Sequence, residues 1–155
     1  MTHVTPFLLF RGDCAEAMEF YQSCLGGDLS ITRLADTPMK DDMPAEQAHK
    51  VVNAVLRSGD IVLTATDWLH ATRVPRHGNM VGIYLTDVPY DRLRAVFDKL
   101  SDGADPDLLD DLRDMPFGVY GHLVDKYGVQ WFFRGDRSRP EGGAGARWDD
   151  VTEVT

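Results

Sequence analysis

The feature that most constrains this chain is an internal repeat of a strand followed by a helix. A strand-like segment at 5–10 precedes apolar residues at helical spacing, which end at Gly26-Gly27. A second strand-like segment at 80–85 precedes another helical stripe, which ends before Gly103. The two stripes close on Leu25 and Leu100, which lie 75 residues apart. The repeat therefore predicts two similar modules.

Local signals predict where the two helices begin. For the first, expected near Asp13–Leu25, Asp13 is the predicted N-cap, and Glu16 three residues later completes a capping box. For the second, expected near Val88–Leu100, Asp87 is the predicted cap, with Pro89 in the first turn. The apolar stripes are Ala17, Phe20, Tyr21, Cys24 and Leu25 in the first helix and Leu93, Val96, Phe97 and Leu100 in the second.

Three strand-like segments follow each helix. In the first module they are 29–34, 50–56 and 61–66, with a hairpin turn at 58–60. In the second module they are a weak segment at 104–109, then 119–124 and 129–134, with a turn at 125–128. Each module thus reads βαβββ, and the expected fold class is α+β. The coil at 36–48 is long and carries two prolines, which predicts a functional or mobile loop.

These segments set the expected domain boundaries. The first module is expected at 1–78, the second at 79–135, and a flexible tail at 136–155. The tail carries one proline and three glycines between residues 140 and 145, which argues against a regular core element. A single tryptophan, Trp148, could dock this tail on the body of the protein.

Composition and charge narrow the partners. The chain of 155 residues has a formal net charge of −9, so most of its surface would repel DNA or RNA. No apolar run reaches the roughly 18 residues that cross a bilayer. The first ten residues lack the basic start and cleavage site of a signal peptide. We therefore expect a cytoplasmic protein that binds neither nucleic acid nor a membrane.

The two cysteines are expected to be buried free thiols. Cys14 and Cys24 are ten residues apart on one expected helix, a separation of about 15 Å, which is too far for a disulfide. Free thiols fit a reducing compartment. Neither cysteine belongs to a CxxC motif or has an activating base nearby in sequence.

A set of short motifs runs in order from Thr5 to Gly135. Its members are Pro6-Phe7-Leu8-Leu9-Phe10, Glu16-Ala17, Phe20-Tyr21, Gly26-Gly27, the pair Asp60 and Asp67, Gly78-Asn79, and Asp125-Lys126-Tyr127-Gly128-Val129-x-Trp131. The set resembles the PhnB-like branch of the vicinal-oxygen-chelate superfamily, which includes glyoxalases, bleomycin-resistance proteins and dioxygenases. The resemblance implies that two βαβββ modules form one curled, cup-shaped mixed sheet with the helices outside. Some PhnB-like proteins are labelled methyltransferases, but the sequence shows no glycine-rich turn for adenosylmethionine.

Strand alternation separates a face that packs on the helices from a face that lines the cup. The predicted cup-facing ligand candidates are His49, Asn53, Thr64, Trp68, Tyr84, Gln130 and Phe132. The family register places Pro6 and Leu8 inward. Packing against the helices is expected for Val52, Ala54, Leu56, Ile61, Leu63, Ala65, Val81, Ile83 and Leu85. The same is expected for the aromatic residues Phe7, Phe20, Tyr21, Phe97, Trp131 and Phe133. His122 is expected on the packed face, opposite Trp131.

The superfamily takes one metal ligand from each of four cup strands. The matching positions in this sequence are approximately Pro6, Thr64, Gly82 and Phe132. Proline, glycine and phenylalanine side chains offer no donor, and a threonine alone is a poor ligand. If the predicted strand register is wrong by one residue, the residues that then occupy the four metal positions also have no donor side chain. We therefore expect neither a metal nor another cofactor.

Three classes of function remain open. The first is a metal-free protein that binds or sequesters a small organic molecule in its cup. The second is an enzyme of the superfamily, a lyase, isomerase or dioxygenase-like protein, which uses an unrecognised base or metal site, with His49 or His122 as the candidate base. The third is a dimeric module without a ligand. A homodimer is expected in any case, because an open curled sheet leaves strand edges that need cover.

Overall fold

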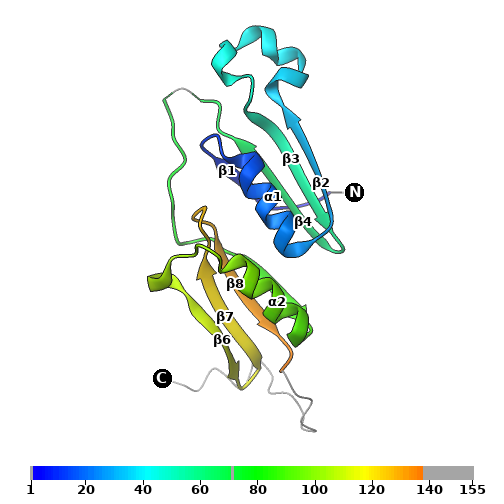
Figure 1. The fold of residues 1–155 in the computed structure, drawn as a ribbon, viewed down its shortest axis with the longest axis vertical. Coiled ribbons are helices and arrows are strands. Elements are labelled where there is room, and N and C mark those ends of the chain that lie inside the picture. The colour runs from blue at the N-terminus through cyan, green and yellow to red at the C-terminus, as the bar shows by residue number, and fades with distance from the viewer. Residues whose placement is uncertain (1, 71, 138–155) are drawn as a thin grey trace. The chain divides into compact units, whose positions relative to one another are not determined.

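The computed structural model describes residues 2–70 and 72–137. The chain divides into two compact units, 1–76 and 77–155. Within the described residues, each unit contains one α-helix and one four-stranded mixed sheet (Figure 1). The predicted α+β class and the two βαβββ modules are therefore confirmed. The prediction that both sheets form one cup concerns the placement of the two units, and it stays a prediction. The expected tail lies outside the described residues from residue 138 onward.

The first unit is a βαβββ module in which the helix covers one face of the sheet. Its elements are β1 (Phe7–Phe10), α1 (Cys14–Leu25), β2 (Asp28–Arg33), β3 (Val51–Ser58) and β4 (Ile61–Asp67). The strand order is β1-β4-β3-β2, with β1 parallel to β4 and the other neighbours antiparallel. Short 3₁₀ turns at Leu34–Asp36, Pro38–Asp42 and Ala45–Gln47 form the loop between β2 and β3.

The second unit repeats this plan. Its elements are β5 (Ile83–Val88), α2 (Tyr90–Leu100), β6 (Asp110–Met115), β7 (Gly118–Val124) and β8 (Gln130–Gly135). The order β5-β8-β7-β6 matches that of the first sheet, and β5 is again parallel to its neighbour. The weak segment at 104–109 is not a strand, because Pro106–Leu108 is a 3₁₀ turn and β6 begins only at Asp110. Both described helices are too short and too polar to cross a lipid bilayer.

The helix starts differ from the prediction. Asp13 makes no side-chain cap bond. Instead the carboxylate of Asp67, at the end of β4, accepts bonds from the backbone N–H groups of Gly12 (2.8 Å), Cys14 (3.0 Å) and Val51 (2.9 Å). A residue distant in sequence therefore supplies the cap. In the second unit Asp87 is not the cap either, because Pro89 occupies that position and makes no side-chain hydrogen bond.

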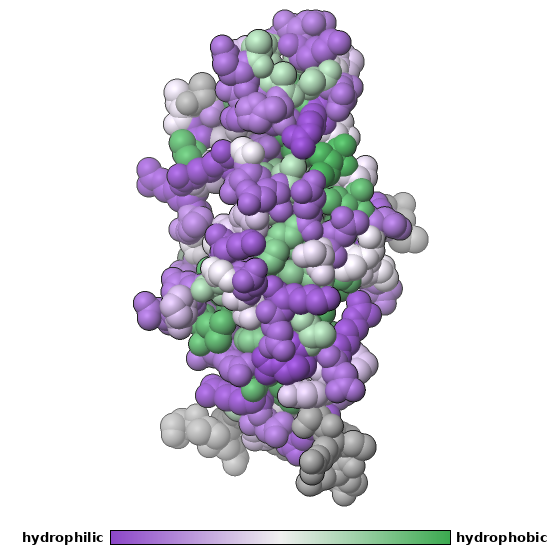
Figure 2. Space-filling view, in the orientation of Figure 1, coloured by the Kyte–Doolittle hydropathy of each residue, from purple (hydrophilic) through white to green (hydrophobic). Residues whose placement is uncertain are grey.

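The core of each unit lies between the helix and the sheet. The predicted stripe of α2 is buried as expected: Leu93, Val96, Phe97 and Leu100. In α1 the buried set includes Cys14 and Met18 as well as most of the predicted stripe, while Phe20 is only half-buried. The sheets contribute alternating residues, led by Leu56, Leu63, Leu123, Trp131 and Phe133. Figure 2 shows that the visible surface of each unit is mostly hydrophilic.

Several face assignments were wrong. β5 begins at Ile83, so Val81 precedes the strand and is 85% exposed rather than packed. A bulge in the pairing of β2 with β3 joins Thr32 to Asn53 and Arg33 to Val51, so Val51 is buried and Val52 only half-buried. Phe7, expected in the core, is 57% exposed.

Candidate ligand-binding site

The open face of the second sheet carries one row of side chains across all four strands. The register pairs Tyr84 of β5 with Phe132 of β8, Phe132 with His122 of β7, and His122 with Asp110 of β6. Directly paired residues point to the same side of a sheet. The four side chains of this cross-strand row are therefore neighbours on the face that α2 leaves uncovered.

His122 stands at the centre of the row. Its ring centroid is 4.8 Å from that of Phe132, and its Nε2 lies 3.3 Å from Oε1 of Gln130. On the other side Nδ1 is 3.9 Å from a carboxylate oxygen of Asp110, so the two form an ion pair only when the imidazole is protonated. The prediction that His122 lies opposite Trp131 was wrong, because the register pairs Trp131 with Leu123. The pleat then turns His122 to the open face.

Gln130 fixes the orientation of the His122 imidazole. Its Nε2 donates to the carbonyl oxygens of Asn79 (3.3 Å) and Val81 (3.4 Å), which leaves Oε1 to face the histidine. An amide oxygen only accepts, so Nε2 of His122 must carry the hydrogen. In the neutral ring the free lone pair is then on Nδ1, the nitrogen that faces Asp110.

Tyr120 lies on the same face, one pair further along β7. It is paired with Arg113 of β6 and Arg134 of β8. Burial raises the pKa of the Tyr120 phenol, and the nearby Tyr84 and Asp110 raise that pKa further. The hydroxyl therefore remains protonated near neutral pH and can donate a hydrogen bond to a ligand.

A groove of about 560 Å³ continues from this face toward the turn before β8. His122 and Gln130 line it together with His77, Asn79, Val124 and Lys126. The ring of His77 packs against the turn glycine Gly128, where an added Cβ would lie only 2.4 Å from the ring. The groove thus includes His122 of the cross-strand row, together with Gln130, which contacts that histidine. A concave surface with aromatic walls and a few convergent polar groups is the usual form of a small-molecule site.

The structure brings three predicted candidates together in the second unit: Tyr84, Gln130 and Phe132. The four candidates of the first unit do not form a comparable group. His49 is exposed in the turn before β3, where its carbonyl accepts a bond from Arg33 (2.6 Å), so its cup-facing placement was wrong. Asn53 is exposed on β3, and the hydroxyl of Thr64 donates to the carbonyl of Pro6.

The face assignment of β1 was also wrong. The parallel register pairs Phe7 with Thr64 and Leu9 with Thr66, so Phe7 and Leu9 share the open face with those threonines. Leu8, expected inward, pairs with the fully buried Ala65 on the helix side. Because β1 is apolar on both faces, alternation alone could not set its register.

The family's metal positions offer no site in either unit. In the first, the only side-chain donor is the Thr64 hydroxyl, which is bonded to Pro6. In the second, the ring of Phe132 fills the space over Gly82, where a Cβ would lie 2.4 Å from it. Across residues 2–70 and 72–137, no three His, Cys, Asp or Glu side chains are grouped to hold an ion. The residues present do not fit a divalent metal.

Two motif aspartates prove to be structural. The carboxylate of Asp67 is 2% exposed and caps α1. Asp125, 3% exposed, accepts bonds from the backbone N–H groups of Tyr127 (2.8 Å) and Val129 (3.1 Å) and from Nε1 of Trp131 (2.9 Å). The motif around Asp125 therefore builds a hairpin turn and anchors a core tryptophan. Both carboxylates are thus engaged in hydrogen bonds that hold the fold.

The chain matches, over residues 2–133, the family described as 3-demethylubiquinone-9 3-methyltransferase. The chain belongs to this family. It is the PhnB-like branch of the vicinal-oxygen-chelate superfamily, as the sequence motifs indicated. No protein of curated function matches the chain.

Solved structures support the same assignment. The protein PA1353 from Pseudomonas aeruginosa is 25% identical, with a TM-score of 0.76 over 89% of this chain and 100% of that one. A PhnB protein from Bacillus cereus is 25% identical, with a TM-score of 0.66 over 86% and 99% of the two chains. A glyoxylase/bleomycin resistance protein/dioxygenase domain from Frankia shares the fold, with 14% identity and a TM-score of 0.57 over 94% and 97%.

The family's name implies a methyl donor such as adenosylmethionine, and the strand-to-helix turns do not fit it. Nucleotide-like cofactors bind where a glycine-rich turn presents free N–H groups at a helix start. At α1 the N–H groups of Gly12 and Cys14 already bond to the Asp67 carboxylate, which would also repel an anionic group. At α2 the cap is Pro89, which has no N–H.

Proposed function

We propose that this protein binds a small, partly aromatic organic molecule on the open face of its second sheet. The observation that carries the proposal is the cross-strand row, in which Tyr84 is 47% exposed and the ring of Phe132 packs against that of His122 at a tilt of 40°. An aromatic surface beside the groove gives a planar ligand apolar area, while Gln130, His122 and Tyr120 can orient its polar groups. Binding or sequestration without a metal is the function that these residues support best.

Native mass spectrometry of the freshly purified full chain tests this proposal. We expect a co-purified small molecule, or a bound member of an aromatic fragment library, on the wild-type protein. Tyr84→Ala and Phe132→Ala should reduce the bound fraction at least tenfold, as loss of a well-packed aromatic contact does. Tyr90→Ala, which removes a tyrosine from the start of α2, is the matched control and should retain binding. Equal binding by all four proteins would refute the proposed site.

A second candidate function is an enzyme that uses His122 as its base. The position of His122 between Gln130 and Asp110 favours it over His49, which is exposed in a turn. On this alternative, turnover of a bound molecule survives a chelator and is lost in His122→Ala. Binding that persists in His122→Ala without any turnover in the wild type supports the binding protein instead. If neither ligand nor turnover is found, the third alternative, a dimeric module without a ligand, is favoured.

We also propose that the protein is a cytoplasmic homodimer. Each sheet ends in two edge strands, and the edge strand β1 exposes Phe7 and Leu9, which a partner chain would cover. The buried free thiol of Cys14 suits a reducing compartment. In sedimentation equilibrium at micromolar concentration we expect twice the chain mass of 17.3 kDa. A 17.3 kDa species contradicts the dimer. If only a chain truncated after Asp136 dimerises, the tail of the full chain covers the strand edge instead.

A further inference from the structure

The first unit contains a second pocket, which has no acidic side chain. It lies where the end of β4 meets the loop between β2 and β3 and has a volume of about 360 Å³. We call it the Trp68 pocket. Its polar and charged lining residues are Arg11, Gln47, Lys50, Trp68, His70 and Arg73. The chain as a whole has 25 acidic and 16 basic residues, so a lining with three lysine or arginine residues and no carboxylate departs strongly from the average.

The cationic groups of this pocket are not paired with a carboxylate in the part of the chain that the structure describes. No carboxylate among the described residues forms an ion pair with Arg11, Lys50 or Arg73. The Arg11 guanidinium donates to the carbonyl of Pro75, with Nε at 2.8 Å, and Nζ of Lys50 lies 3.3 Å from the carbonyl of Trp68. Carbonyl partners hold these side chains in place without cancelling their charge. The local potential is therefore positive within an acidic protein.

Two buried polar atoms of the pocket residues have no partner in the described structure. They are Nε1 of Trp68 and Oε1 of Gln47. A buried donor or acceptor that remains unsatisfied is costly, so each such atom calls for a partner, such as a bound water, ion or ligand group. Here a donor and an acceptor both belong to residues that line the same pocket.

The pocket also offers a flat wall. The rings of Trp68 and His70 are stacked, with centroids 6.2 Å apart and planes 26° from parallel. Nδ1 of His70 accepts from the backbone N–H groups of Thr72 and Arg73, both at 3.2 Å, which places the hydrogen of the neutral ring on Nε2. The remaining lining is apolar and includes Met43 and Val74.

We infer that the Trp68 pocket binds a small planar organic anion, of the class of aromatic carboxylates. The carboxylate would lie among Lys50, Arg73 and the Trp68 indole N–H, because each of these donates and two carry positive charge. The ring would lie against the Trp68–His70 wall and the apolar lining. This site is distinct from the open face of the second sheet, and its failure leaves the function proposed there untouched.

Titration of the ¹⁵N-labelled full chain with benzoate tests the inference. Three tryptophan side chains give three indole N–H resonances, and the one lost in Trp68→Phe belongs to Trp68. Benzoate should shift that resonance in a saturable way. Neutral benzamide of the same shape should bind roughly tenfold more weakly, because it lacks the charge that strengthens such hydrogen bonds. Inorganic phosphate, which is charged but has no ring, should also bind more weakly than benzoate.

Charge variants identify the groups responsible. Lys50→Gln and Arg73→Gln should each weaken benzoate binding by roughly five- to tenfold. Arg73 is exposed and its side chain makes no hydrogen bond among the described residues, so its replacement leaves the fold intact. Lys99→Gln, an exposed lysine on α2, is the matched control and should bind as the wild type does. The inference is overturned if the Trp68 resonance does not respond to benzoate, if benzamide or phosphate binds as tightly, or if Arg73→Gln leaves the affinity unchanged.

Discussion

The two units share one backbone plan but use their open faces differently. In the first sheet the open face carries Phe7, Leu9 and threonines whose hydroxyls bond locally, Thr64 to Pro6 and Thr66 to Val51 and Val52. In the second sheet the corresponding face carries aromatic and titratable side chains, centred on His122. Repetition of a module therefore preserves the fold and leaves the chemistry free to differ between the copies.

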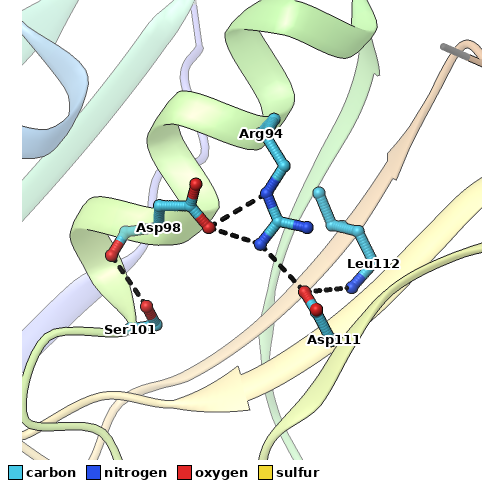
Figure 3. A network of polar contacts seen from close by, with 5 residues as sticks. All are labelled: Arg94, Asp98, Ser101, Asp111 and Leu112. Carbon is cyan, nitrogen blue, oxygen red and sulfur yellow. Dashed lines mark hydrogen bonds and ion pairs between the residues drawn. The ribbon is translucent and has the colours of Figure 1, made fainter.

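The units also differ in how the helix is held. In the first, the buried carboxylate of Asp67 joins the start of α1 to β3. In the second, α2 is tied to the edge strand β6 by an exposed network, in which Arg94 bonds to Asp98 on its own helix and to Asp111 (2.8 Å) (Figure 3). The hydrogen bond to Asp98 raises the pKa of Arg94, and that to Asp111 adds to it. A buried cap and an exposed ion-pair network should differ greatly in their contribution to stability.

The largest expected effect is that of Asp67→Ala. The change leaves three backbone N–H groups without their acceptor, so we expect the free energy of unfolding to fall by about 3 to 5 kcal/mol. Urea denaturation measures this loss. Asp60→Ala, in the exposed hairpin turn of the same unit, is the control and should change stability by less than about 0.5 kcal/mol. Similar losses in the two variants would show that the cap does not hold the first unit together.

A smaller effect concerns the pH dependence of stability at Cys14. Burial raises the pKa of this thiol from 9.0 to about 12, and the nearby carboxylates of Asp67 and Asp13 add to the effect. The unfolded chain then loses its thiol proton at lower pH than the folded chain does. Stability contributed by Cys14 is full below pH 9 and is lost as the pH rises toward 12.

We therefore expect the free energy of unfolding to fall by roughly 2 kcal/mol more between pH 9 and 11 in the wild type than in Cys14→Ala. Denaturant titrations at both pH values measure the difference. Because the wild type and Cys14→Ala share all other groups that titrate in this range, comparing the pH dependence of their unfolding free energies isolates the contribution of Cys14. The same pH dependence of the unfolding free energy in both proteins would mean that the thiol is not buried in the folded protein.

The smallest effect is expected for the exposed network of the second unit. Asp111→Asn removes the negative charge that pairs with Arg94, whose side chain is 30% exposed. The free energy of unfolding should fall by less than about 1 kcal/mol. The loss should shrink further in high salt, since exposed ion pairs are screened. A cost as large as that of Asp67→Ala would contradict the distinction between the two units.

The sequence allowed the fold to be predicted better than the site. Helical stripes, hairpin turns and the repeat are local signals, and they led correctly to two βαβββ modules and to the buried residues of α2. The errors came from distant pairing. Asp67 caps α1 from 53 residues away, a bulge at Val52 reverses a face, and the position of His122 depends on which β8 residue it meets. Alternation along a strand separates the residues into two faces, but it does not show which face the helix covers.

The sheet face of the ligand candidates was predicted correctly where the alternation along the strand was clear. Gln130 and Phe132 alternate with the strongly buried Trp131 and Phe133, so their face was unambiguous. His49 was misplaced because it lies in a turn, where alternation has no meaning. The Trp68 pocket had only one sequence signal, a tryptophan after a strand, since its basic residues come from segments that meet only in the folded unit.

The central claim is that the open face of the second sheet binds ligand. Backbone amide shifts of the ¹⁵N-labelled full chain, recorded during titration with a set of neutral aromatic amides, test it most directly. We predict saturable shifts clustered at Tyr84, His122, Gln130 and Phe132, with the helix-facing Leu123 and Phe133 affected less. Shifts spread evenly over both units, or confined to residues outside the second sheet, would contradict the account.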